Sequence, residues 1–208
     1  MNKFSIILVV FAATFFIAGR ACAYNYYSHH YGYFDNYYFG LNAGVADTNP
    51  DGVPSISGGT FNLTYGKNYR NNFNDFVVGA GVILGYSSNG SYTIDNFDGR
   101  GDNAKAYINS LYYGGFLKGG YAFDNIMPFI KLGIVGYSFG ATCTYYGPYG
   151  DLYETYSTPL STEGGLLYGI GVEYMLNRNW GVTAQYFGAA LSGGDEVDNF
   201  TIGADFNF

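Results

Sequence analysis

The last ten residues of the chain, NFTIGADFNF (199–208), alternate apolar and polar side chains. In an extended strand successive side chains point to opposite faces, so every second residue shares a face. One face carries Thr, Gly, Asp and Asn, and the other carries Phe200, Ile202, Ala204, Phe206 and Phe208. A soluble sandwich would bury this apolar face against a second sheet, whereas a transmembrane barrel would turn it toward lipid. The rest of the sequence decides between these two folds.

The first 23 residues have the three parts of a secretory signal peptide. Lys3 supplies the positive start, residues 4–18 are apolar, and an A-x-A cleavage site follows at 21–23. The apolar stretch is shorter than the roughly 20 residues that a membrane-spanning helix needs. A lipoprotein signal cleaved before Cys22 is a weaker alternative, because Arg20 stands where such signals carry small or apolar residues. We therefore predict a signal peptide at 1–23, a Tyr-rich leader at 24–35 and a barrel domain at 36–208.

The composition of the predicted mature chain excludes several classes of protein. Its 185 residues suit one domain. It has 7 basic and 16 acidic residues, a net charge near −9, which argues against a nucleic-acid partner. Cys143 would be its only cysteine, so neither an intrachain disulfide nor a cysteine metal site is expected. The 32 Gly, 24 Tyr and 18 Phe of the full sequence do not suit a helical protein, and no long apolar run follows residue 23.

Segments with the alternation of the last ten residues recur along the chain. In 76–86 (FVVGAGVILGY), for example, apolar side chains alternate with glycines. Their length matches the roughly 9 to 11 residues that a tilted transmembrane strand requires. The pattern predicts eight strands, at 36–46, 76–86, 91–97, 108–123, 128–141, 165–175, 180–189 and 199–208.

The connections between these segments alternate in length. The short ones are 87–90, 124–127 and 176–179, and the longer ones are 47–75, 98–107, 142–164 and 190–198. Such alternation is typical of a barrel with short periplasmic turns and long outer loops. We therefore expect an all-β, eight-stranded, antiparallel up-and-down transmembrane barrel. Residues 60–65 (TFNLTY) also alternate, so they either extend the first hairpin or add a strand pair and make ten strands.

The order of these motifs resembles the small outer-membrane barrels of the OmpA transmembrane-domain, OmpX and opacity-protein type. The resemblance covers essentially the whole mature sequence, and it implies a location in the bacterial outer membrane, in contact with its lipid. It also implies that the barrel-insertion machinery recognises the C-terminal strand, through Phe200, Ile202, Phe206 and Phe208. The matching motifs are FGLNAGVA (39–46), GAGVILGY (79–86), MPFIKLGIVGY (127–137), YGIGVEYMLNRNWGVTAQY (168–186) and NFTIGADFNF (199–208).

The interior of an eight-stranded barrel is just wide enough for side chains to fill it, so no open pore is expected. The predicted inward residues include four charges at one height, namely Lys118, Lys131, Glu173 and Asp205. We expect them to form a structural network, because an unpaired charge in so narrow an interior is costly. Lys131 and Glu173 lie on neighbouring predicted strands and form the expected pair. An ion gate or a catalytic dyad is the functional alternative.

Catalytic chemistry has few candidate residues. The only histidines, His29 and His30, lie in the leader, where we interpret them as part of a flexible segment rather than as a base or a metal pair. Glu163 and Asp195 are weak acid candidates at the bases of predicted loops. We therefore expect no enzyme activity, no cofactor and no metal.

The predicted loop 142–164 carries aromatic residues suited to binding. Tyr, Gly, Asp and Asn supply rigid contact area and adaptable hydrogen bonds, and Tyr, Gly and Asn are enriched in antibody paratopes. The candidates are Tyr145, Tyr146, Tyr149 and Tyr153. The hypothesis for function is a monomeric structural or adhesive anchor that presents loops to a host or cell-surface ligand. A narrow channel for small solutes is the alternative, and an outer-membrane enzyme comes third.

Overall fold

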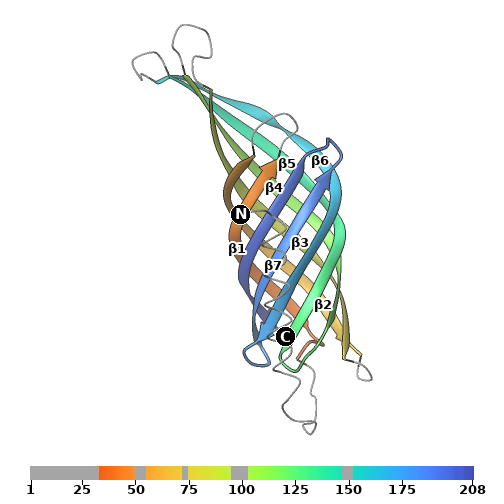
Figure 1. The fold of residues 1–208 in the computed structure, drawn as a ribbon. Helices are drawn as coiled ribbons and strands as arrows, with labels where there is room; N and C mark the ends of the chain where they lie inside the picture. The colour runs from red at the N-terminus through yellow and green to blue at the C-terminus, as the bar shows by residue number, and fades with distance from the viewer. Residues whose placement is uncertain (1–32, 50–54, 72–74, 95–102, 147–151) are drawn as a thin grey trace.

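The chain forms one closed β-barrel (Figure 1). The computed structural model describes residues 33–49, 55–71, 75–94, 103–146 and 152–208. Each strand is antiparallel to the next, and the last pairs with the first, so the predicted fold class is confirmed. The strands are β1 (Tyr37–Asn49), β2 (Ile56–Arg70), β3 (Phe76–Ile94), β4 (Asn103–Tyr121), β5 (Ile126–Tyr146), β6 (Leu152–Met175), β7 (Trp180–Leu191) and β8 (Glu196–Asn207).

The two ends of the barrel differ. The connections 71–75, 122–125 and 176–179 lie at the end where β1 begins and β8 finishes, which we call the turn end. The other end, the loop end, carries the connections that follow β1, β3, β5 and β7. The described residues contain no helix of the length and apolar character needed to cross a membrane.

The predicted positions of the second and third strands are wrong. Residues 60–65 form the centre of β2, and the predicted turn at 87–90 lies inside β3. β3 continues past it through an irregularity between Ser88 and Ser91, where Gly90 has a φ of +93°. The alternation of 60–65 marks the centre of β2, but the polar inward side chains Thr60, Asn62, Thr64 and Asn68 resemble those of a loop, so the sequence left its role open.

The predicted loop at 142–164 is also wrong, because most of it is strand. β5 runs to Tyr146 and β6 begins at Leu152. β4 likewise begins inside the predicted loop 98–107, and β8 inside 190–198. Side chains beyond the membrane need no apolar face, so these segments lack the alternation that identifies the transmembrane strands.

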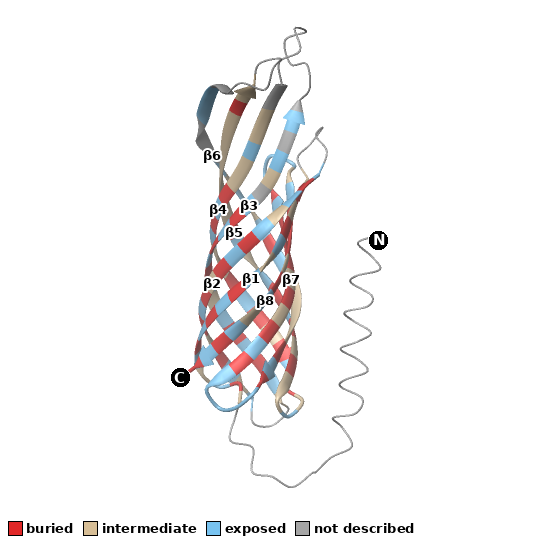
Figure 2. Cartoon of the chain, turned by 90° about the vertical axis from the view of Figure 1, so that its left-hand side faces the viewer, coloured by how far each residue is buried: buried red, intermediate tan, exposed pale blue. Residues whose placement is uncertain are grey.

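Four strands extend beyond the ring at the loop end, and they form what we call the outer sheet (91–94, 103–109, 140–146 and 152–163). Pairing of β2 with β3 ends at Gly59↔Ser88, and pairing of β6 with β7 reaches no further than Gly165↔Leu191. β3, β4, β5 and β6 nevertheless stay paired with one another well beyond these points. Figures 1 and 2 show them projecting past the other strands.

Buried and exposed residues alternate along the strands within the ring (Figure 2). On β3, Val77 and Ile83 are buried, whereas Val82 is 56% exposed. The outer wall is therefore apolar, and near the turn end it carries an aromatic belt. Ring centroids are 5.0 Å apart for Trp180 and Phe206, and 6.2 Å apart for Tyr37 and Phe208. Such belts lie at the membrane–water interface.

Ring closure depends on Gly44, which faces the interior between Thr60 on β2 and Thr201 on β8. A Cβ atom there would lie 1.8 Å from the Phe200 carbonyl oxygen. Because that oxygen belongs to the backbone, Gly44→Ala can be accommodated only by opening the pairing of β1 with β8. We expect it to lower the free energy of unfolding by about 3 kcal/mol, the upper range for overpacking. A smaller fraction of the unheated protein should then migrate on a gel as the faster, folded band.

The matched control is Gly115→Ala, since a Cβ there would point outward with only the Gly81 carbonyl oxygen nearby, at 3.8 Å. This variant should keep the mobility and stability of the parent chain. Equal stability of the two variants would contradict the closure argument.

Candidate functional site

Side chains fill the barrel interior in three layers. The layer at the turn end is apolar and consists of Phe34, Val77, Ala122, Met127, Phe129 and Met175. The layer toward the loop end is largely aromatic and includes Tyr112, Tyr137 and Phe187, with Tyr112 and Tyr137 stacked at 5.1 Å. Between them lies a charged layer, which contains the four charges predicted to point inward, and all four are buried. They are Lys118, Lys131, Glu173 and Asp205.

The structure brings the four predicted lumen charges together in the charged layer. Lys118 Nζ lies 3.0 Å from Glu173 Oε2, and both side chains are almost fully buried. β4 and β6 are not neighbours in the ring, so this ion pair crosses the interior. Asp205 on β8 accepts a hydrogen bond from the Thr183 hydroxyl on β7.

The expected pairing of Lys131 with Glu173 is wrong. Lys131 Nζ instead donates a hydrogen bond to Gln185 Oε1 at 2.7 Å. The strand register explains the difference, because Lys131 is paired with Gly169 on β6, four residues from Glu173. Lys118 reaches Glu173 across the interior, a contact between non-neighbouring strands that strand order alone did not reveal.

Aromatic rings surround the two ammonium groups. Lys118 and Lys131 are directly opposite each other on β4 and β5, so their positive charges repel each other. Lys118 Nζ lies 4.5 Å from the Tyr38 ring centroid, and Lys131 Nζ lies 4.2 Å from that of Phe116. The centroid of the Phe129 ring is 5.1 Å from Lys118 Nζ and 5.7 Å from Lys131 Nζ. These cation–π contacts and the two carboxylates offset the repulsion.

The charged layer leaves almost no free space. The cavity between Tyr38, Lys118, Lys131 and Asp205 has a volume of about 10 Å³. That is about the space that one water molecule occupies. Among the described residues, therefore, no open passage crosses the barrel at this level.

Phe34 is a core residue that sequence reasoning missed. It precedes β1, yet it is only 1% exposed and packs into the layer at the turn end, with Tyr33 beside it. It shares that layer with Phe129, whose ring contacts both lysines. Phe34 thus covers the charged layer on the turn side. Nothing in the sequence marks it, because it is one aromatic residue among many in an aperiodic segment.

The predicted insertion residues lie on β8 and at its end. Ile202, Phe206 and Phe208 are 54%, 36% and 58% exposed on the outer wall, and Phe200 lies on the same face. Phe208 exchanges backbone hydrogen bonds with Tyr37, of 2.9 and 3.2 Å. The C-terminal residue thus completes the seam between the last strand and the first.

The predicted binding tyrosines are divided between described and undescribed parts of the chain. Tyr145 and Tyr146 are half-buried at the loop end of β5. Tyr149 and the side chain of Tyr153 lie outside the described residues. Tyr156, which the sequence did not single out, is 64% exposed on β6.

Of the four catalytic candidates, the structure describes Glu163 and Asp195. His29 and His30 lie outside the described residues. Glu163 accepts a hydrogen bond from the Gly193 N–H at 3.2 Å, and Cys143 is a free, half-buried thiol. In the part of the chain that the structure describes, no three His, Cys, Asp or Glu side chains gather as a metal site would require.

A closed up-and-down barrel with an apolar outer wall, an aromatic belt and a polar layer inside defines a transmembrane barrel of the bacterial outer membrane. The chain belongs to the outer membrane protein beta-barrel domain family, whose model matches residues 9–208. The predicted resemblance and localisation are therefore confirmed. In such barrels the turn end faces the periplasm and the loop end faces outward.

Solved structures share this fold. Ail, the attachment invasion locus protein of Yersinia pestis, is 17% identical, with a TM-score of 0.51, covering 84% of this chain and 99% of that chain. A major outer membrane protein from Thermus thermophilus is 14% identical, with a TM-score of 0.50, and the match covers 83% of this chain and 99% of that chain. At these identities the similarity shows the fold alone. Among curated protein sequences, none matches this chain significantly.

The Lys118–Glu173 pair gives a test of the charged layer. Glu173→Gln leaves the Lys118 ammonium buried without its carboxylate, so we expect it to lower the free energy of unfolding by about 3–5 kcal/mol. Replacing both partners, by Lys118→Met with Glu173→Leu, should restore most of the loss because no unpaired charge remains. The measurement is urea unfolding in lipid vesicles, followed by gel mobility.

Lys105→Met is the matched control, because Lys105 lies on the outer sheet and forms no ion pair among the described residues. It should change stability by less than about 0.5 kcal/mol. A single Glu173→Gln variant as stable as this control would contradict a buried structural pair.

Proposed function

We propose that the protein is a surface adhesin in which the barrel is an anchor and the outer sheet is the binding element. The observation that carries the proposal is the extension of β3, β4, β5 and β6 beyond the ring. On the outward side of the membrane, this sheet places side chains and strand edges where another surface can reach them.

The filled interior supports a function outside the barrel. A solute channel needs a continuous wet path, whereas the charged layer encloses only about 10 Å³. No observation in the described residues favours a channel or an enzyme over the adhesive role.

The two faces of the outer sheet differ in chemistry. On the face continuous with the outer wall, Lys105 Nζ lies 4.9 Å from the Tyr107 ring, and this tyrosine is 43% exposed. The opposite face carries Ala106, Cys143 and Tyr156 in one cross-strand row. Exposed tyrosines supply contact area with little loss of side-chain entropy on binding. This composition supports binding to a protein or glycan surface.

The edges of the outer sheet support the same role. Among the described residues, 91–94 of β3 have no partner on β2, and 152–163 of β6 have no partner on β7. Backbone groups at such an edge can pair with an extended segment of another protein. The sheet therefore offers both side-chain and backbone contacts.

Two further parts of the hypothesis remain proposals. We propose that the insertion machinery recognises β8 through Phe200, Ile202, Phe206 and Phe208, since these residues share the lipid-facing side of the terminal strand. We also propose that the barrel acts as a monomer, since its ring closes without leaving an edge strand in the membrane.

Shortening the outer sheet tests the adhesive role. Thr142 and Ser157 are cross-strand partners, so residues 143–156 can be replaced by Asn-Gly, which forms a two-residue hairpin turn. Bacteria displaying this variant should bind epithelial cell layers and fibronectin-coated surfaces no better than bacteria without the protein. The full chain should bind at least one of them, and gel mobility should show that the shortened barrel still folds.

Point variants separate side-chain contacts from edge pairing. Tyr156→Ser should reduce adhesion if side chains contribute, and Tyr69→Ser, at another exposed tyrosine that lies at the turn end, should not. Unchanged adhesion of the shortened, folded variant would contradict an adhesive role of the outer sheet.

A further inference from the structure

We propose that the outer wall of β1 to β4 holds one anionic phospholipid of the periplasmic leaflet. Lys67 would bind the head-group phosphate, and a hollow beside it would hold an acyl chain. The inference rests on the geometry of the wall and is independent of the adhesive role.

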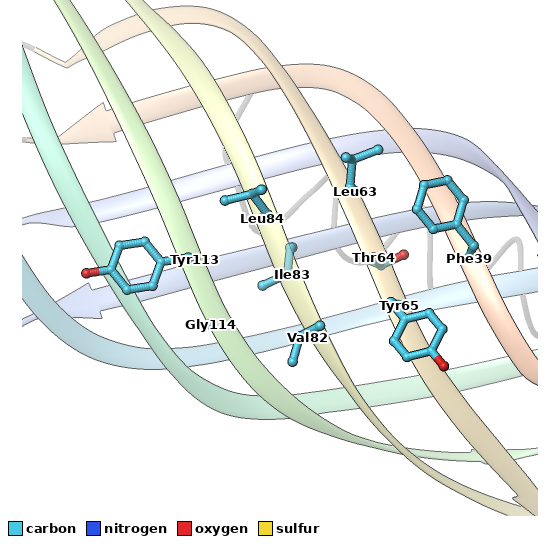
Figure 3. A pocket seen from close by; sticks show the side chains of 9 residues that line it. All are labelled: Phe39, Leu63, Thr64, Tyr65, Val82, Ile83, Leu84, Tyr113 and Gly114. Carbon is cyan, nitrogen blue, oxygen red and sulfur yellow. The ribbon is translucent and has the colours of Figure 1, made fainter.

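The hollow has a volume of about 410 Å³ and lies on the lipid-facing side of the barrel (Figure 3). Phe39 and Tyr65 border it on one side and Tyr113 on the other, with Leu63, Val82 and Leu84 between them (Figure 3). Nearly all of its lining is apolar, and its volume is within the range of small-molecule sites. The surface therefore fits a hydrocarbon chain.

A glycine leaves the wall without a side chain beside the hollow, next to the lining residue Gly114. Phe39, Tyr65, Val82 and Gly115 form one cross-strand row on the outer face. A Cβ on Gly115 would meet only the Gly81 carbonyl oxygen, at 3.8 Å, so the space outside this glycine is open. Because Val82 is the cross-strand partner of Gly115 and lines the hollow, this open space lies at the edge of the hollow.

Lys67 lies on the same face of β2 as Tyr65 and one step closer to the turn end. Its cross-strand partner is Tyr37, the first residue of β1. Lys67 Nζ is 4.6 Å from the Tyr37 ring centroid and 4.4 Å from that of Tyr69. The rings of Tyr37 and Tyr69 lie at the height of the aromatic belt, where a long lysine side chain extends toward lipid head-groups.

The positive charge of Lys67 favours an anionic ligand beside the hollow. Among the described residues Lys67 makes no ion pair, and the only ion pairs seen are Arg70–Asp75 and Lys118–Glu173. Asp47 and Asp198 occupy outward positions of β1 and β8 near the loop end, so neither lies on the described wall beside Lys67. A phospholipid supplies both an anion and an acyl chain there.

The test uses the full chain folded in phosphatidylcholine vesicles that contain phosphatidylglycerol with a photoreactive diazirine on its acyl chain. After illumination, mass spectrometry locates the labelled peptides. We expect label on β2 and β3, near the hollow. Lys67→Gln should weaken this labelling about fivefold, the effect of one lysine near an anionic surface. Gly115→Leu should reduce it by placing a side chain at the edge of the hollow, opposite Val82.

Each variant has a matched control. Lys105→Gln removes another half-buried lysine that lies over a tyrosine ring, on the outer sheet. Gly119→Leu adds the same side chain at another outward glycine, where a Cβ would meet nothing closer than 3.9 Å. Both controls should label like the parent chain, and gel mobility should confirm that all four variants fold.

Three results would overturn the proposal. Equal labelling of the Lys67→Gln and Lys105→Gln variants would exclude head-group binding at Lys67. Equal labelling of the Gly115→Leu and Gly119→Leu variants would exclude an acyl chain in the hollow. Cross-linked dimers that disappear only in Gly115→Leu would assign the hollow to a second copy of the chain.

Discussion

The structure depends on closing a ring of backbone hydrogen bonds inside lipid. Hydrocarbon offers no partner for an unpaired N–H or C=O group, so a sheet can span a membrane only when it has no open edge. β8 meets β1 from Tyr38↔Asn207 to Asn49↔Glu196, and Phe208 adds the last backbone bonds to Tyr37. Phe208 therefore belongs to the seam. Gly44 serves the same seam by leaving room for the opposing backbone.

A ring of eight strands determines what the interior can hold. It is narrow enough for side chains to fill, and a buried charge must then find its partner within the ring. The Lys118–Glu173 pair meets this demand across the interior, with apolar layers containing Phe34 and Tyr137 on its two sides. With the interior occupied, chemistry on this scaffold is confined to surfaces. The outer wall meets lipid, and the outer sheet meets whatever lies beyond the cell.

The sequence predicted the fold class and the identity of the inward residues, because alternation is strong wherever one face must meet lipid. It failed where that constraint is absent. Alternation does not reveal most of the outer sheet, because neither of its faces is lipid-facing, and it leaves the role of 60–65 open because Thr and Asn fill the inner side of β2. The four lumen charges were found from strand parity alone. Their pairing was not, since Lys118 reaches Glu173 through a cross-barrel contact. Phe34 could not be recognised because it lies outside any periodic segment.

We propose that the barrel interior is closed and that function resides on the outside. Single-channel recording in a planar bilayer tests this most directly, using the refolded chain without residues 1–23 and its unheated gel mobility as proof of folding. The account predicts a silent membrane, because the charged layer and the apolar layers beside it leave no continuous path for ions. Discrete, reproducible openings from verified folded protein would contradict it and would make Lys118, Lys131, Glu173 and Asp205 the residues that line a pore.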